Sequence, residues 1–184
     1  MKQLLALAVM AAFAACNSRP PTPTSDTKSG MDSSATQVKD IQSPYPISYS
    51  SRFTMDDPKN AESLLAIWKA YDNANFSTVK DLLADTVELH LAGGMTMRAS
   101  RDSIISAVQA YRNGFTAAID KVNAIMAVKS TDKNEHWALI WGMETDTHKN
   151  GKVDSVYLQE TWKFDQDGRT SLMYQFNAPA MAKK

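Results

Sequence analysis

Two side chains of this sequence could carry acid/base chemistry. Glu160 lies in an alternating run from Val156 to Phe164 and shares the phase of the apolar residues Leu158 and Trp162. A carboxylate on an apolar strand face is costly to bury without a partner. We therefore expect Glu160 either to open into a cavity, where it could act as a general acid or base, or to pair with a Lys or Arg or a helix tyrosine.

His90 is the second candidate, because histidine suits proton transfer near neutral pH. It alternates with Leu89 and Leu91, so it leaves the more apolar face of its strand. The alternative is a surface or hydrogen-bonded structural role. The other histidines, His136 and His148, lie at the two ends of one expected strand. The domain has no cysteine and no close His/Asp/Glu spacing, so we predict no metal site, and nothing indicates a cofactor.

Aromatic side chains provide a third chemical signal. Rings with a few polar groups among them suit flat apolar ligands. Most rings of the domain should belong to the core or to an interface, and a few should line a ligand pocket. The predicted pocket residues are Trp68, Tyr71, Trp141, Tyr174 and Gln175.

The N-terminus predicts export. An apolar run from Leu4 to Ala15 is too short to cross a bilayer but suits a signal peptide over residues 1–15. It ends at Cys16, the only cysteine of the chain, and resembles a bacterial lipobox. The resemblance implies a lipid anchor on Cys16, and Asn17 after it implies the outer membrane, facing the periplasm. An ordinary secretory signal is the alternative.

Residues 16–56 should form a disordered tether. This stretch holds five of the seven prolines and many Ser and Thr residues, so it cannot bury enough apolar surface to offset the entropy of ordering. Within it, Tyr45 to Phe53 could pack onto the domain as a short arm. Formal charges balance at 20 Lys+Arg against 20 Asp+Glu, so no basic field indicates a nucleic-acid partner.

One domain is expected over residues 57–180. Asp57 and Pro58 suit the start of a helix, a second short helix follows from Phe76, and Ser100 suits the cap of a third. Alternating patterns then predict a strand at about 87–91 and later strands at about 119–128, 136–147, 153–164 and 170–177, with Asn150-Gly151 as a hairpin turn. The fold class is α+β, with three N-terminal helices on one face of a curved antiparallel sheet.

The order of these segments resembles a known family. The runs Ile67–Asp72, Leu83–His90 and Gln159–Phe164, with the Asp167-Gly168-Arg169 turn, are similar to nuclear-transport-factor-2-like domains, which include SnoaL-like polyketide cyclases and ketosteroid isomerases. The resemblance implies a cone-shaped roll, a strongly bent sheet wrapped around helices with a pocket at its wide end. It names no activity, because the family is functionally mixed.

One departure from the family bears on function. SnoaL-like cyclases carry an acid a few residues beyond the last turn, where this chain has Gln175 and Asn177, and an amide cannot donate a proton as an acid does. We therefore favour a lipid-anchored domain that binds a small apolar or aromatic ligand without catalysis. The alternatives are an acid/base isomerase, cyclase or dehydratase using Glu160 and His90, or a module that forms homodimers through a sheet face exposing Tyr157 and Ile140.

Overall fold

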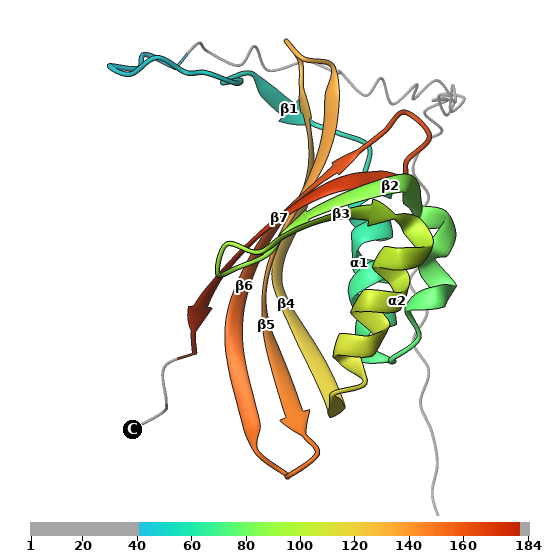
Figure 1. The fold of residues 1–184 in the computed structure, drawn as a ribbon. Coiled ribbons are helices and arrows are strands. Elements are labelled where there is room, and N and C mark those ends of the chain that lie inside the picture. The colour runs from blue at the N-terminus through green and yellow to red at the C-terminus, as the bar shows by residue number, and fades with distance from the viewer. Residues whose placement is uncertain (1–40, 181–184) are drawn as a thin grey trace, which may run out of the picture. The chain divides into compact units, whose positions relative to one another are not determined.

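The structure, a computed structural model, describes residues 41–180 (Figure 1). The predicted signal peptide, Cys16 and most of the predicted tether lie outside the described residues. Within the described part of the chain, the search for a helix long and apolar enough to span a bilayer finds none.

Three helices form one layer of the domain. They are α1 (Lys59–Asp72), the 3₁₀ helix η1 (Phe76–Leu82) and α2 (Arg101–Arg112). Asp57 accepts a hydrogen bond at 2.9 Å from the backbone N–H of Lys59, and Ser100 accepts one at 3.3 Å from that of Ser103. Both side chains satisfy N–H groups that a helix start leaves free, as the sequence predicts.

The second layer is a seven-stranded sheet in the order β1-β4-β5-β6-β7-β2-β3. Its strands are β1 (Phe53–Met55), β2 (Leu83–His90), β3 (Thr96–Ser100), β4 (Phe115–Ser130), β5 (Glu135–His148), β6 (Val153–Phe164) and β7 (Thr170–Pro179). The α+β class with a curved, mostly antiparallel sheet is confirmed. The exception is the pair β2/β7, which is parallel, with Leu89 opposite Met173.

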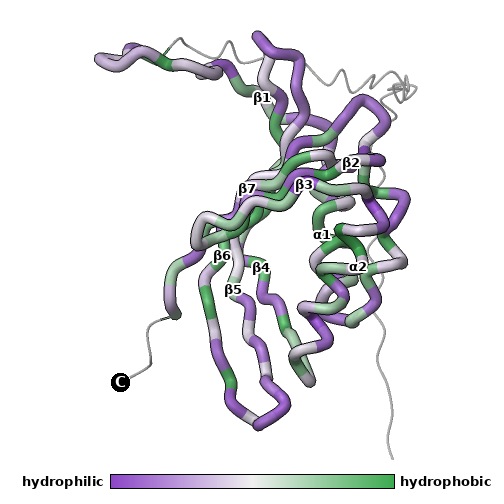
Figure 2. The backbone as a smooth tube through the Cα atoms, viewed as in Figure 1, coloured by the Kyte–Doolittle hydropathy of each residue, from purple (hydrophilic) through white to green (hydrophobic). Residues whose placement is uncertain are grey.

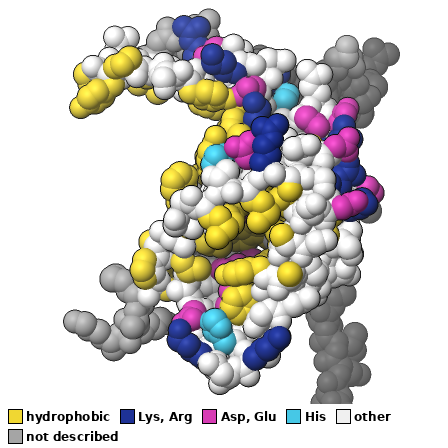
Figure 3. Space-filling model, viewed as in Figure 1, with side chains coloured by type: hydrophobic (Ala, Val, Ile, Leu, Met, Phe, Trp, Pro, Cys, Tyr) yellow, Lys and Arg dark blue, Asp and Glu magenta, His cyan; other side chains and the backbone are white. Residues whose placement is uncertain are grey.

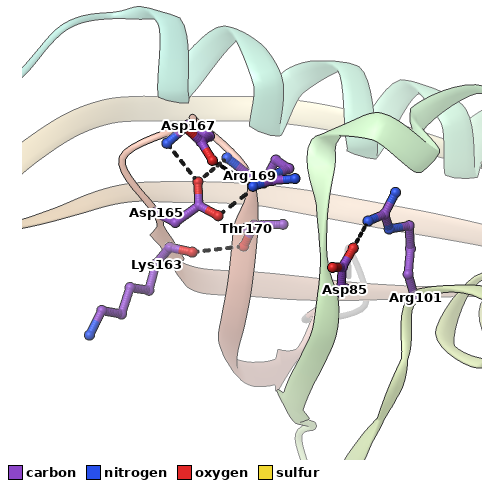
Figure 4. Close-up of polar contacts among 7 residues, drawn as sticks. All are labelled: Asp85, Arg101, Lys163, Asp165, Asp167, Arg169 and Thr170. Atoms are coloured by element: carbon purple, nitrogen blue, oxygen red, sulfur yellow. Dashed lines mark hydrogen bonds and ion pairs between the residues drawn. The ribbon is translucent and has the colours of Figure 1, made fainter.

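Turns join the long strands where the sequence predicts them. Gly151 adopts a φ of 82° in the β5–β6 hairpin, a value that glycine reaches without strain. Figure 4 shows the β6–β7 turn, in which Asp165 accepts hydrogen bonds at 2.9 Å from the backbone N–H groups of Asp167 and Arg169. The same figure shows an ion pair between Asp85 of β2 and Arg101 at the start of α2, which links helix layer and sheet.

The helices pack on the concave face of the sheet, which curves around them (Figure 1). Hydropathy alternates along β5 and β6, as expected of strands with one face inward (Figure 2). The core between the layers includes Leu64 and Ile67 of α1, Ile104 of α2, Ile140 of β5 and Phe164 of β6. These side chains anchor the helices at one end of the long strands.

Gly142 of β5 allows α1 to approach the sheet closely. A Cβ at this position would lie 2.6 Å from a ring carbon of Trp68 and 2.9 Å from the backbone oxygen of Lys121. Both distances are far below van der Waals contact, so no larger residue fits without moving the indole. The glycine thereby fixes the position of Trp68 over the concave face.

The sheet begins within the residues that the sequence assigns to the tether. β1 pairs with the end of β4, with Phe53 opposite Ser130, and Asp56 lies 2.7 Å from Nδ1 of His136. Tyr49 meets Trp137 edge-on, with ring centroids 6.1 Å apart, whereas Tyr45 is exposed. The expected aromatic arm thus contacts the domain through Tyr49.

Candidate functional site

A cavity of about 610 Å³ lies between the helices and the concave face of the sheet. In the view of Figure 3 a hollow opens in this face of the molecule, with hydrophobic side chains around it and acidic side chains inside. The side chains that line the cavity form an apolar part and an acidic part. Apolar side chains from β2, β3 and α2 form one part, among them Leu89, Met97 and Val108, and acidic side chains from β4, β5 and β6 form another.

Glu160 of β6 lies in this cavity and is only 5% exposed. Its Oε2 accepts hydrogen bonds from the indole N–H groups of Trp68, at 2.7 Å, and Trp162, at 2.9 Å. Its Oε1 accepts one from the amide of Gln175 at 2.8 Å. Three neutral donors from α1, β6 and β7 therefore satisfy the carboxylate that the sequence expects to need a partner.

Four further acids line the cavity, and one of them, Asp154, pairs with His148 and Lys152. Asp120 comes from β4, and Glu144 and Asp146 come from β5, where residues two apart lie on the same face. The carboxyl of Asp120 shares a hydrogen bond with that of Asp72, and the carboxyl of Glu144 shares one with that of Asp146. Among residues 41–180 no Lys or Arg forms an ion pair with Asp120, Glu144, Asp146 or Glu160.

Burial and mutual repulsion keep protons on this cluster. Burial raises the pKa of Asp120 to about 8, with Asp72 adding to the effect, and raises that of Glu144 to about 8, with Asp146 and Asp120 adding. The pKa of Asp146 is also raised by burial. At neutral pH this part of the cavity therefore holds carboxylic acid groups able to donate protons. Glu160 acts electrostatically on Asp120 and Glu144 and adds to the rise of their pKa values.

The arginine that acts on Asp146, Arg112, donates its hydrogen bonds to backbone oxygens. Arg112 of α2 is buried and donates hydrogen bonds to the backbone oxygens of Tyr71, Asp72 and Phe115, at 2.9 to 3.2 Å. These bonds hold the ends of α1 and α2 together beside the acids. In the described part of the chain, no group of three or more His, Cys, Asp or Glu side chains is arranged to hold a metal ion.

The structure brings together four of the residues that the sequence assigns to a site. Trp68, Tyr71, Gln175 and Glu160 all line the cavity. Burial raises the pKa of Tyr71, and its hydroxyl is buried without a hydrogen-bond partner. Trp68 and Gln175 serve chiefly to hold Glu160.

His90, Trp141 and Tyr174 do not line this cavity, whereas His90 and Tyr174 line a second pocket of about 340 Å³ together with Gln175 and Phe176. His90 stacks on Tyr174 with ring centroids 4.7 Å apart, and its Nε2 lies 2.8 Å from Glu88. Their strand neighbours Leu89 and Met173 point inward, so these rings lie on the opposite face of the sheet. Trp141 lies between Ile140 and Gly142, which face inward, so it also faces outward. Glu160 and His90 therefore cannot act on a common atom.

The expectation of an exposed Ile140 is also wrong. Its side chain is fully buried, because the inward phase of β5 is that of Ala138 and Ile140. Tyr157, by contrast, is 47% exposed on the outer face, beside the exposed Phe176 of β7. A homodimer through this face stays a prediction.

Asp120, Glu144 and Asp146 are not among the site residues predicted from the sequence. A signal for two of them was present, since Glu144 and Asp146 follow Ile140 in the same strand phase and must face inward if Ile140 does. Asp120 had no such signal. The β4 strand bulges between Val122 and Ala124, which shifts its phase relative to the rest of the strand.

Comparison with solved structures shows the same fold in several proteins. An LEH-like epoxide hydrolase from M. tuberculosis superposes with a TM-score of 0.55 at 17% identity, over 65% of this chain and 83% of that chain. A candidate SnoaL-like polyketide cyclase from Shewanella denitrificans OS-217 gives a TM-score of 0.55 at 14% identity, over 66% and 92%. An NTF2-like protein from Burkholderia pseudomallei K96243 gives 0.53 at 15% identity, over 65% and 91%.

These likenesses support the NTF2-like fold that the sequence resemblance implies. The fold occurs in proteins described as enzymes, so the fold alone does not assign an activity here. No protein-family model and no curated protein sequence matches this chain.

Replacing Glu160 should separate the loss of its charge from the loss of its hydrogen bonds. Glu160→Ala leaves the indole N–H groups of Trp68 and Trp162 buried without an acceptor, so we expect a loss of about 3 kcal/mol or more in the free energy of unfolding. Glu160→Gln keeps an acceptor for both indoles and should cost less than half as much. Urea unfolding of both variants measures the difference, and equal losses would contradict the assignment.

The raised pKa values predict how stability depends on pH. In the unfolded chain Asp120 and Glu144 lose their protons near pH 4, whereas in the folded domain they lose them near pH 8. The folded state binds more protons between these values, so the free energy of unfolding should fall by several kcal/mol as pH rises from 5 to 9, since each group contributes up to about 1.4 kcal/mol per pH unit.

The double variant Asp120→Asn, Glu144→Gln should flatten this profile and unfold at a higher urea concentration than the wild type at pH 8.5. Asp102→Asn is the matched control. Lys80 lowers the pKa of Asp102, so its titration lies below the pH range tested. A wild-type profile that rises or stays level between pH 5 and 9 would count against the buried acid cluster.

Proposed function

We propose that residues 41–180 form a binding domain that holds a small apolar molecule in the cavity without changing it chemically. The observation that carries the proposal is the cavity itself, with about 610 Å³ of space and a predominantly apolar lining from β2, β3 and α2. Apolar pockets of this size with a few convergent polar groups are typical of small-molecule sites. With the lipid that the sequence predicts at Cys16, the domain would present this pocket at a membrane surface.

The apolar part of the cavity accounts for most of the expected affinity. Leu89 of β2, Leu91 of the turn after it, Met97 of β3, and Ile104 and Val108 of α2 line it. Covering an apolar ligand with these side chains removes its surface from water, at roughly 25 cal/mol for each Å². Gln175 and Asn177 line the same cavity from β7, as amides where SnoaL-like cyclases are expected to carry an acid.

Filling the cavity should abolish binding. Ala107 of α2 lines the cavity and Ala110, on the same helix, is exposed, so Ala107→Trp places a ring in the ligand space and Ala110→Trp places one in solvent. We expect the neutral dye Nile red to bind the wild type and the Ala110→Trp control equally, with at least about fivefold weaker binding to Ala107→Trp. Fluorescence titration measures the affinities, and equal binding by all three proteins would overturn the proposal.

A second candidate function is acid/base catalysis, and one arrangement favours it. Protonated Asp120 and Glu144 lie in the same cavity as Glu160, whose Oε1 accepts a hydrogen bond from Gln175 alone. Glu160 together with one of the protonated acids could open an epoxide, which is the substrate class in the name of one structural neighbour. Glu160 would take a proton from water as its oxygen attacks carbon, and an acid would protonate the departing oxygen to give a diol.

Styrene oxide tests this second candidate. Catalysed hydrolysis should decline as pH rises through about 8, because the donating acid loses its proton there. Asp120→Asn combined with Glu144→Gln should lower the rate by about a hundredfold or more. Product formation is measured by chromatography, with Asp81→Asn, an exposed acid, as control. A wild-type rate no higher than that of the double variant rejects catalysis of this kind and leaves the binding proposal intact.

A further inference from the structure

The acidic part of the cavity contains oxygen atoms that the fold leaves without partners. Asp146 is only 8% exposed, lines the cavity, and its Oδ1 accepts no hydrogen bond. The same holds for Oδ1 of Asp120 and for the hydroxyl of Tyr71, both buried atoms of cavity-lining side chains. Buried polar atoms in folded proteins are nearly always paired, so three unpaired atoms in one cavity indicate a missing partner.

A partner for these atoms would bring hydrogen-bond donors, and a positive charge on it would be attracted to the acids. Carboxylate oxygens only accept, and a primary ammonium group offers three N–H donors. The side chains of Arg112 and His148 act electrostatically on Asp146, but Arg112 donates its hydrogen bonds to three backbone oxygens, and His148 and Lys152 bind Asp154. A bound cation would favour the ionised forms of Asp120 and Glu144, whose pKa values are near 8, and would add to the effect of Arg112 and His148 on Asp146.

Aromatic rings surround the same part of the cavity. Tyr71, Tyr111 and Phe115 all line it, and the Tyr111 and Phe115 ring centroids lie 5.3 Å apart. Glu144 and Asp146 act electrostatically on both tyrosines, which places rings and acids together. Ring faces attract ammonium groups, and carboxylates attract them more strongly.

We propose that the cavity selects an apolar molecule carrying an ammonium group, with its apolar body against β2, β3 and α2 and its cationic group among Asp120, Glu144, Asp146 and Tyr71. This inference rests on the proposed binding function and specifies its ligand class. Glu160 is outside the cationic subsite, because its three hydrogen bonds to Trp68, Trp162 and Gln175 already satisfy it.

Three probes of one shape and different charge test the inference. They are 1-adamantanamine, which is cationic, 1-adamantanol, which is neutral, and 1-adamantanecarboxylate, which is anionic. Calorimetric titration of the purified protein at pH 7.5 should show the amine binding at least about tenfold tighter than the alcohol, and the carboxylate weakest. An alcohol that binds as tightly as the amine, or a carboxylate that binds best, overturns the inference and leaves an apolar pocket.

Variants connect the preference to the named acids. Glu144→Gln combined with Asp146→Asn should weaken amine binding about tenfold and change alcohol binding less than threefold, so the alcohol also shows that the variant retains its pocket. Asp81→Asn should change neither affinity. An amine preference that survives the double variant places the cation elsewhere and overturns the inference. If none of the three probes binds the wild type, the proposed apolar pocket fails together with its ligand class.

Discussion

The arrangement of this domain depends on one buried carboxylate. Glu160 is only 5% exposed, and three N–H donors from α1, β6 and β7 pair with its oxygens, which offsets the cost of burying them. Trp68 reaches across from the helix layer only because Gly142 lacks a side chain beneath its ring. One acid, one glycine and two tryptophans thereby set how closely α1 approaches the sheet, and with it the width of the cavity.

The depth of the cavity follows from a difference in length between the layers. β4, β5 and β6 are 16, 14 and 12 residues long, whereas the helix layer is anchored at the Phe164 and Ile140 end of these strands. Asp120, Glu144 and Asp146 occupy inward positions beyond that region, where the ends of α1 and α2 approach through Asp72 and Arg112. An apolar residue there would extend the core. The acids instead leave the cavity lined by groups that repel one another.

The sequence predicts the parts of this fold that depend on local chemistry. The cap at Ser100, the Asn150-Gly151 turn and the inward phase of Glu160 follow from neighbouring residues, and the structure has all three. The strands β1 and β3 and the parallel pairing of β2 with β7 are not predictable from the sequence, because short strands have weak patterns and long-range pairing leaves no local signal. His90 and Tyr174 line a second pocket, which is separate from the cavity of Glu160 because their contact across β2 and β7 lies on the outer face.

The cavity contains two kinds of buried acid, one paired by the protein and one left with unpaired oxygens, and we assign the first to folding and the second to function. The protein supplies every partner that Glu160 needs, so this acid contributes to a unique packing of helix on sheet. Asp120 and Asp146 lack an equivalent set of hydrogen-bond partners, and each keeps one unpaired oxygen. Repulsion between these acids lowers the stability of the domain above neutral pH. A fold that satisfies one carboxylate so fully could satisfy the others by the same means. Buried polar groups that stay unpaired without a structural gain are characteristic of functional sites. The unpaired acids are therefore the residues expected to determine which ligand binds.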